Sequence, residues 1–240
     1  MSNKLDLYPV VCYNTAFLGN FPGIFHFIDM LTELLVIAHL TMFKPQFEAA
    51  SRVVLATRSF SMENRYGNEF VNTVFKDNIL LTLNYMTGAV KNKNEINWDN
   101  IEKPATYEFT LKPGEGFAFH DQILSTYKDS IVKTTNAHFN YSDGFKSDGY
   151  LTGDGVCHLA SLIYCAAKDA GVTSVSLARH DFAKINEVPK EYGVSIKYMP
   201  GAFANSANQN LYIVNNHDKA ITFAFDYDGT NLTVKVVENV

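Results

Sequence analysis

The spacing of apolar residues predicts two helices after residue 50. In residues 68–86, apolar side chains recur at the 3.6-residue spacing of one helix face, and Gly88 follows as a fitting end. In residues 156–170 most positions are apolar or good helix formers, and Gly171 follows. We expect both segments to be helices that pack into a core.

Alternating apolar positions and β-branched residues predict a series of short strands. The segments with this pattern are 52–60, 105–111, 117–119, 172–179, 194–199, 210–215, 220–226 and 231–237. Asp228-Gly229 is a hairpin signal between the last two. Residues 140–155 are rich in Gly, Asp and Ser and predict a long loop, and long loops are often functional.

An apolar run over residues 24–43 predicts a further helix, ended by Lys44-Pro45. It contains Asp29 and Glu33, and an acidic residue near a bilayer centre costs about 2–3 kcal/mol. Membrane contact through residues 24–43 is therefore the less favoured reading, and an amphipathic or buried helix is expected. The basic N-terminal region of a signal peptide is not recognisable.

These elements together predict an α+β fold. We expect residues 1–50 to form an N-terminal helical extension and residues 51–240 to form one mixed domain of helices and strands. In that domain the helix that carries Cys157 packs on a mainly antiparallel sheet. A cysteine at a helix start, followed by strands that carry a histidine, also resembles the order of parts in transglutaminase-like and papain-like proteins.

Composition narrows the functional classes. The 240 residues are 47% hydrophobic and 19% charged, which is typical of a folded protein. The net charge is −5, and no Lys/Arg cluster is longer than two residues, so no nucleic-acid groove is expected. Cys157 and Cys165 would lie about 12 Å apart on one helix. A disulfide needs Cα atoms within about 7 Å, so these two should stay unbridged.

Several segments resemble one known family. They are Leu-Lys-Pro-Gly-Glu-Gly-Phe-Ala-Phe-His (111–120), Gly-Asp-Gly-Val-Cys-His-Leu-Ala-Ser-Leu-Ile-Tyr-Cys-Ala-Ala (153–167), Ala-Gly-Val (170–172), Arg-His (179–180), Val-Ser-Ile-Lys-Tyr-Met-Pro-Gly (194–201) and Asn-Leu-Tyr-Ile-Val-Asn-Asn (210–216). From residue 107 to 237 the chain thus resembles the VanW family of bacterial cell-envelope proteins, and residues 58–86, with Asn64-Arg65 before a helix, look similar too. Residues 1–50 match no family pattern.

The chain departs from that family pattern at several positions. The family has Asn where this chain has His120, and Gln where it has His158. Two expected Asp residues are Phe203 and Asn210. These two changes put in doubt the third member of any catalytic triad. The resemblance implies an extracytoplasmic location in the envelope and a cell-wall peptide or glycan as partner.

Cys157 is the strongest candidate for chemistry. Gly153, Asp154 and Gly155 precede it and deliver it to the first turn of a helix. Unpaired N–H groups at a helix start lower the pKa of a thiol, and thiolate is the nucleophilic form. Glycines there allow a substrate to approach the backbone, so Gly153, Asp154 and Gly155 are candidate binding residues. The alternative is that Cys157 is a small buried hydrophobic residue.

Three histidines lie within the resembling region. His180 follows the strand after the Cys157 helix, where a general base would be expected. His158 points about 100° away from Cys157 on the helix, so it is expected to pack or to line the edge of the site. His120 and Asp121 are candidate binding residues, with a structural polar contact as the alternative.

No metal or cofactor is expected. Cys157, His158, His180 and His120 are suitable zinc ligand types, but they lack the spacing of a zinc site. Asp143, Asp148 and Asp154 miss calcium-loop spacing, and no Gly-rich loop ends in Gly-Lys-Ser/Thr.

The leading hypothesis is a VanW-like envelope protein that binds or modifies peptidoglycan or its peptides. If it is an enzyme, Cys157 is the nucleophile and His180 the base for acyl transfer or amide hydrolysis. The alternative is a non-catalytic wall-binding or scaffolding module with a structural Cys157. The enzyme needs a hydrogen-bonded Cys–His pair beside a cleft, whereas the binder needs only the cleft. A fully buried Cys157 would favour a third hypothesis, an inert VanW-like fold in the cytoplasm.

Overall fold

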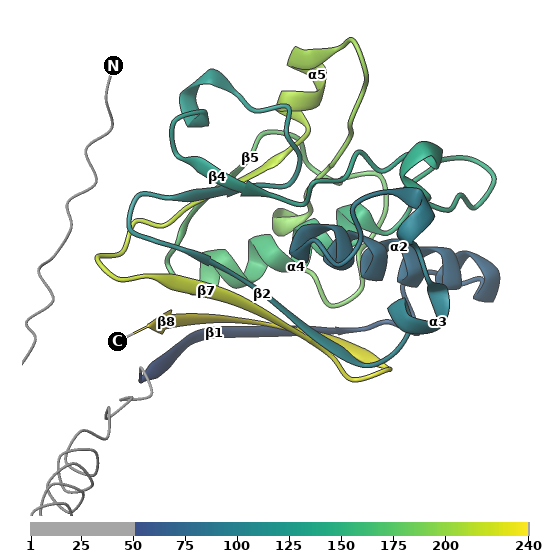
Figure 1. Ribbon diagram of the computed structural model, residues 1–240, viewed down its shortest axis with the longest axis horizontal. Coiled ribbons are helices and arrows are strands. Elements are labelled where there is room, and N and C mark those ends of the chain that lie inside the picture. The colour runs from purple at the N-terminus through teal and green to yellow at the C-terminus, as the bar shows by residue number, and fades with distance from the viewer. Residues whose placement is uncertain (1–50, 240) are drawn as a thin grey trace, which may run out of the picture. The chain divides into compact units, whose positions relative to one another are not determined.

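The computed structural model describes residues 51–239 (Figure 1). Its main elements, in chain order, are β1 (Arg52–Ser61), α2 (Glu69–Thr87), α3 (Trp98–Ile101), β2 (Ala105–Leu111), β3 (Gly116–Ala118), β4 (Ile131–Thr134), α4 (Val156–Asp169), β5 (Thr173–Ser176), α5 (Phe203–Asn208), β6 (Leu211–Val214), β7 (Ile221–Tyr227) and β8 (Asn231–Asn239). Short 3-10 turns are η1 (Lys93–Glu95), η2 (Ser125–Tyr127), η3 (Tyr141–Asp143) and η4 (Lys190–Tyr192). The helix expected over 24–43 and the extension 1–50 lie outside the described residues, so the domain division stays a prediction. Between residues 51 and 239, no helix combines the length and hydropathy needed to span a bilayer.

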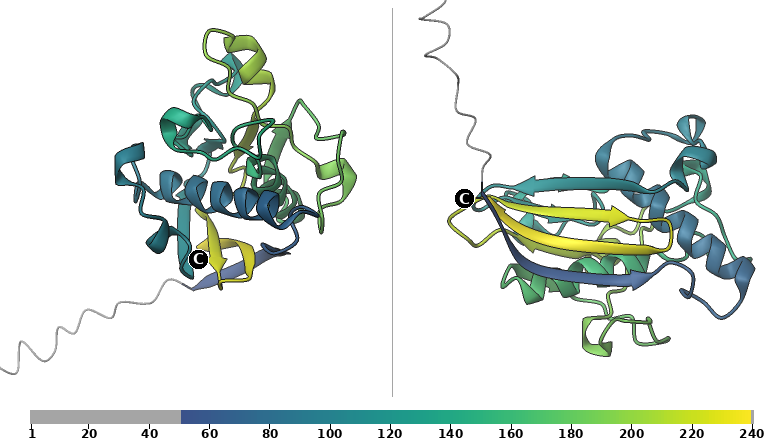
Figure 2. Two further views of the ribbon diagram at one scale, coloured as in Figure 1. Left: turned by 90° about the vertical axis from the view of Figure 1, so that its right-hand side faces the viewer. Right: turned by 90° about the horizontal axis from the view of Figure 1, so that it is seen from below.

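The strands form two four-stranded sheets. The first has the order β1-β8-β7-β2, with every neighbouring pair antiparallel (Figure 2). The predicted hairpin between β7 and β8 is confirmed, with Asp228 N–H donating to the Asn231 carbonyl over 3.2 Å. The second sheet has the order β4-β3-β6-β5, in which only β3 and β4 run parallel.

Helix α4 lies between the two sheets. It contacts β1 and β8 of the first sheet and β5 and β6 of the second (Figure 1). Leu159, Ile163 and Ala166 are fully buried, as expected for a helix covered on most sides. Helix α2 packs against α4 and β2. The predicted α+β class, with a Cys157-bearing helix on a mainly antiparallel sheet, is confirmed.

Stacked phenylalanines connect the two sheets. The ring of Phe109 on β2 lies 4.7 Å from that of Phe117 on β3 and 5.1 Å from that of Phe223 on β7. All three side chains are buried. Burying each ring contributes about 1.5–3 kcal/mol relative to leaving it exposed, so this stack is a main contact between the two sheets.

The predicted strand over residues 194–199 is wrong. Only an isolated bridge joins Val194 to Arg179 there. The backbone N–H groups of Val194 and Ile196 instead donate to side chains of α4. The N–H groups of Ser195 and Lys197 donate to backbone carbonyls. The apolar pattern fits a half-buried segment, but hydropathy does not reveal that alternate N–H groups donate to side chains. The strand over 172–179 is also shorter than predicted, and β4 and α5 were not predicted.

The start of α4 packs directly on the backbone of α2. Gly155, the residue before α4, has φ +97°, and a Cβ there would lie 2.5 Å from the Phe75 carbonyl oxygen. Gly153 has φ +84°, and a Cβ there would lie 2.8 Å from the Phe139 carbonyl oxygen. Both positions therefore require glycine for conformation and for space.

A buried amide of α2 fixes the loop that leads to α4. The Asn78 Nδ2 group donates to the carbonyl groups of Lys146 (3.0 Å) and Asp154 (2.9 Å). Its Oδ1 accepts from Lys146 N–H over 2.9 Å. Asn78 thus satisfies backbone groups at both ends of the 146–154 loop. These hydrogen bonds fix the position of the first turn of α4.

We predict that Gly155→Ala strongly destabilises the protein. The left-handed backbone costs about 1–2 kcal/mol, and the overlap with Phe75 adds a similar penalty. Together they should lower the free energy of unfolding by about 3 kcal/mol, measured by urea denaturation. Gly171→Ala is the matched control, because Gly171 also has positive φ (+71°) but has open space around it. An equal loss in both variants would contradict the packing argument.

Candidate functional site

The Cys157 thiol binds the backbone of a neighbouring segment. Its Sγ accepts from Ile196 N–H over 3.4 Å, and the thiol lies 3.6 Å from the Ile196 carbonyl oxygen, to which it donates. One helical turn later, Ser161 Oγ accepts from Val194 N–H over 2.8 Å. The two side chains together hold residues 194–196 against α4.

The surroundings of Cys157 shift the pKa of its thiol in the direction opposite to the predicted one. The residue is partly exposed, but its thiol faces the Ile196 backbone. Burial raises the pKa of the Cys157 thiol to about 11, and the nearby Asp154 carboxylate acts in the same direction. The prediction that the helix start lowers this pKa is therefore wrong, because burial outweighs the helix N-terminus. Cys157 is a neutral thiol at neutral pH.

His158 points to a different part of the core. Its ring lies 5.0 Å from the Phe75 ring and 5.9 Å from the His180 ring, edge-on to both. Only 4% of the residue is exposed, and Nδ1 has no hydrogen-bond partner in the described part of the chain. Burial lowers the pKa of His158 to about 3, with the Arg65 charge adding to the effect, so the ring is neutral.

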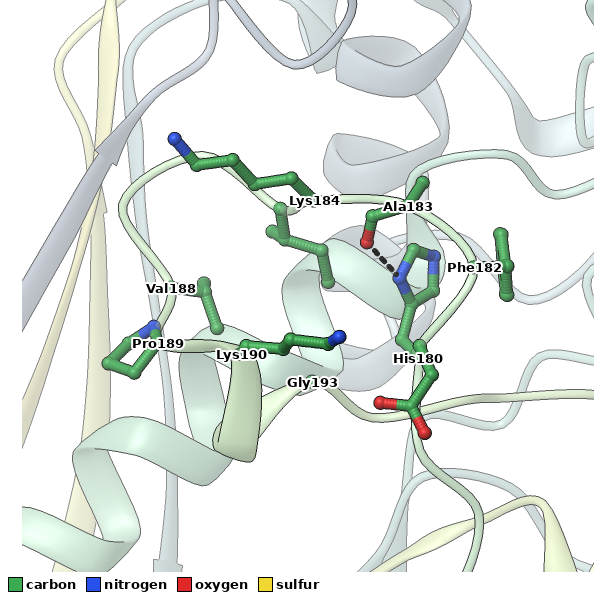
Figure 3. A pocket seen from close by; sticks show the side chains of 10 residues that line it. His180, Phe182, Ala183, Lys184, Val188, Pro189, Lys190 and Gly193 are labelled. Atoms are coloured by element: carbon green, nitrogen blue, oxygen red, sulfur yellow. Dashed lines mark hydrogen bonds between the residues drawn. The ribbon is translucent and has the colours of Figure 1, made fainter.

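His180 is engaged by its own loop. Its Nδ1 lies 3.1 Å from the Ala183 carbonyl oxygen, which can only accept, so Nδ1 carries the proton and Nε2 is left as an acceptor (Figure 3). Burial lowers the pKa of His180. Across residues 51–239, no hydrogen bond joins His180 to Cys157. The nucleophile–base contact expected from the sequence is not formed.

The loop that begins at His180 encloses a pocket of about 430 Å³ (Figure 3). Its floor includes buried Ile185 and Val188, which pack on Cys165 of α4. Phe182 is 76% exposed and lies beside the His180 ring. The lining residues are His180, Asp181, Phe182, Ala183, Lys184, Ile185, Val188, Pro189, Lys190 and Gly193. The volume falls in the range of about 300–1,000 Å³ that is typical of small-molecule sites.

A buried arginine fixes this loop at its middle. The Arg65 side chain has no exposed surface and forms an ion pair with Glu187. It also donates to the Asn186 carbonyl (3.3 Å) and the Ser61 carbonyl (2.6 Å), and its guanidinium lies 4.0 Å from the Phe60 ring centroid. Because Arg65 donates to the last residue of β1, Ser61, the first sheet positions the pocket loop.

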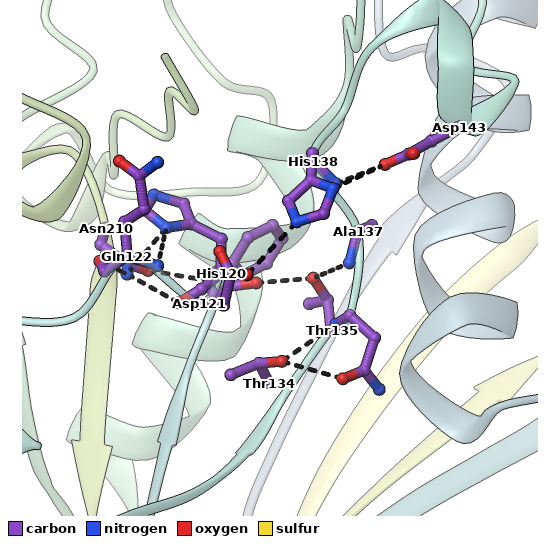
Figure 4. A network of polar contacts seen from close by, with 11 residues as sticks. His120, Asp121, Gln122, Thr134, Thr135, Ala137, His138, Asp143 and Asn210 are labelled. Atoms are coloured by element: carbon purple, nitrogen blue, oxygen red, sulfur yellow. Dashed lines mark hydrogen bonds and ion pairs between the residues drawn. The ribbon is translucent and has the colours of Figure 1, made fainter. Parts of the chain in front are cut away.

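Two of the departures from the VanW pattern contact each other. His120 is fully buried, and Asn210 Nδ2 donates to its Nδ1 over 3.2 Å (Figure 4). His120 Nε2 donates to the Gln209 carbonyl over 3.2 Å. Burial lowers the pKa of His120 to about 4, so its ring is neutral. His120 and Asn210 therefore form one structural pair, and neither lines the 180–193 pocket.

Asp121 takes part in a second polar contact at the surface. His138 Nε2 lies 3.3 Å from Asp121 Oδ2, and its Nδ1 lies 3.4 Å from Asp143 Oδ2 (Figure 4). The Tyr198 ring lies 4.4 Å from the His138 ring. The two carboxylates flank opposite edges of one imidazole, so they do not converge on a single point. Throughout the described range, no group of three or more His, Cys, Asp or Glu side chains is placed to hold a metal ion.

Asp154 and Phe203, also singled out from the sequence, lie in different settings. Asp154 Oδ2 accepts from Asp148 N–H over 3.2 Å inside its loop. Burial raises the pKa of Asp154 to about 6, and the Asp148 carboxylate adds to this. Phe203 begins α5 and is 57% exposed. Of the candidate residues, only His180 lines the pocket.

The pocket itself was missed from the sequence. Its loop has no regular structure except η4, and Arg65 and Glu187 are 122 residues apart. The only sequence signal was the similarity of Asn64-Arg65 to the family pattern. That signal did not indicate which loop the arginine would hold.

Comparison with known proteins gives one match. The family described as VanW like protein matches residues 99–237. This range covers α4, the pocket loop and most of both sheets. Neither a curated protein nor a solved structure matches the chain, so the transglutaminase-like arrangement stays a prediction.

We predict that native Cys157 reacts slowly with iodoacetamide near pH 8. With a pKa of about 11 instead of 9.0, the thiolate fraction is about 100-fold lower than in the unfolded chain. The rate should rise about tenfold per pH unit until it levels off near pH 11. The measurement uses Cys12→Ser with Cys165→Ser, so that Cys157 is the only thiol, and compares native and denatured protein. A native rate midpoint below about 8.5 would contradict the account.

Proposed function

The chain belongs to the VanW family, and on that premise we propose that it is a non-catalytic binding module of the bacterial cell envelope. Its ligand is peptidoglycan or one of its peptides, and its binding site is the 180–193 pocket. The observation that carries this proposal is that both expected catalytic side chains are already hydrogen-bonded to backbone groups. Cys157 is bonded to Ile196, and His180 to Ala183.

The pocket supports binding because it combines an apolar floor with charged groups at its rim. Ile185 and Val188 can receive an aliphatic part of a ligand, while Lys184, Lys190 and Asp181 offer polar contacts. Small-molecule sites typically have this mixture. The exposed Phe182 ring adds an aromatic surface at the edge, and such rings often dominate binding energy.

The enzymatic alternative is Cys157-dependent acyl transfer or amide hydrolysis. It requires a thiolate with a base within hydrogen-bond reach, or a rearrangement that creates one when substrate binds. A thiol with its pKa raised to about 11 and held by a backbone amide disfavours this chemistry. The family resemblance supplies the envelope setting for either activity.

We predict that the full chain co-sediments with purified peptidoglycan through the pocket. Phe182→Ala should weaken binding by about tenfold, because an exposed aromatic at a binding site commonly contributes 1–2 kcal/mol. Phe203→Ala is the matched control, since Phe203 is also an exposed phenylalanine but lies on α5. Cys157→Ser should bind like the wild type, because a hydroxyl can replace the thiol at the Ile196 backbone.

The same samples test the enzyme directly. The peptidoglycan supernatants are compared by mass spectrometry for released or rearranged peptides. Products formed by the wild type but not by Cys157→Ser would establish the enzyme and refute the binding module. If Phe182→Ala and Phe203→Ala bind peptidoglycan equally well, the 180–193 pocket is not the binding site.

A further inference from the structure

The lining of the pocket carries more positive than negative charge. Its lining contains two lysines and one carboxylate, Lys184, Lys190 and Asp181. Within residues 51–239, neither lysine forms an ion pair, while the ion pairs that do form involve other cations. This local excess contrasts with the net charge of −5 for the whole chain.

Two other acidic residues belong to this loop, and neither lines the pocket: Glu191 is exposed, and Glu187 is already paired. Glu187 belongs to the same loop, but both of its carboxylate oxygens are engaged, one by Arg65 and one by the Asn64 Nδ2 group at 3.1 Å. Because the buried Arg65 charge needs a counter-ion, Glu187 cannot turn towards the lysines without leaving a buried charge unpaired. The lysines are therefore available to an anionic ligand.

The lysine at η4 has the better position. The Lys190 side chain reaches across the pocket towards His180, whereas Lys184 extends along the other end of the loop (Figure 3). The residues before Lys190 are Val188, which is buried, and Pro189, which restricts the backbone. His180 faces the same space with a neutral ring, so it adds no competing charge.

We infer that the pocket recognises a free carboxylate of a short peptide, with Lys190 as its main partner and the apolar floor receiving the neighbouring aliphatic side chain. This inference rests on the proposed function and names the group in the wall peptide that is recognised. A carboxylate fits better than a phosphate. Phosphate sites usually add arginine forks or clustered backbone N–H groups, whereas this lining contains no arginine.

The test is a competition experiment with the full chain bound to immobilised peptidoglycan. The competitors are diacetyl-Lys-D-Ala-D-Ala, whose only ionised group is the C-terminal carboxylate, and the same peptide as a C-terminal amide. The free acid should compete at a concentration about tenfold lower than the amide. Lys190→Gln should remove this difference, and Lys197→Gln should keep it, because Lys197 is exposed and does not line the pocket.

The outcomes separate this inference from the proposed function. Suppose that peptidoglycan binds through the pocket while the acid and the amide compete equally, or while neither competes. Either result would refute recognition of the carboxylate but would leave the proposed binding module intact. Discrimination that persists in Lys190→Gln would overturn the assignment to Lys190, and its persistence in Lys184→Gln as well would exclude both lysines. Absence of peptidoglycan binding by the wild type would refute the proposed function and this inference with it.

Discussion

The close packing of the start of α4 on α2 is the constraint on which the arrangement of the site depends. Gly155 lies so close to the Phe75 carbonyl that no side chain fits, and Asn78 holds the preceding loop. This fixes which face of α4 carries Cys157. That face then holds residues 194–196, and the loop before them, anchored by Arg65, encloses the pocket. The Cys157 motif, which resembles that of a catalytic nucleophile, thus connects α4 to the 194–196 segment and to the pocket loop before it.

The balance of two electrostatic effects explains the neutral thiol. A helix N-terminus favours an anion by about 0.3–1 kcal/mol. The rise of the Cys157 pKa from 9.0 to about 11 corresponds to about 2.7 kcal/mol against the thiolate. Desolvation therefore decides the state of the sulfur. The same reasoning applies to His158 and His120, which burial keeps neutral, so these rings serve as packing and hydrogen-bonding groups.

The sequence predicted the parts of this structure whose partners are local. Strand 105–111 is predictable because its alternation follows the burial of one face. Helix 68–86 is predictable because its cap residues, Asn68 and Gly88, lie next to it in sequence. The strand predicted over 194–199 is absent because the N–H groups of Val194 and Ile196 donate to side chains of α4, more than thirty residues away, and not to a neighbouring strand. The glycines of the Cys157 motif suggest access for a substrate, but the structure requires them for space, Gly155 against Phe75 of α2 and Gly153 against Phe139. The pocket could not be predicted because it depends on an ion pair between residues far apart in the chain.

The most direct test of the central claim is amide hydrogen exchange at Ile196 in Cys157→Ala and Cys165→Ala. Both variants remove one sulfur from the same helix, but only Cys157 accepts the Ile196 N–H. We expect exchange at Ile196 to be faster by about five- to tenfold in Cys157→Ala alone, because a hydrogen bond worth about 1 kcal/mol is lost. Unchanged exchange at Ile196 in Cys157→Ala would mean that the thiol does not hold this segment, and the structural role of Cys157 would be refuted.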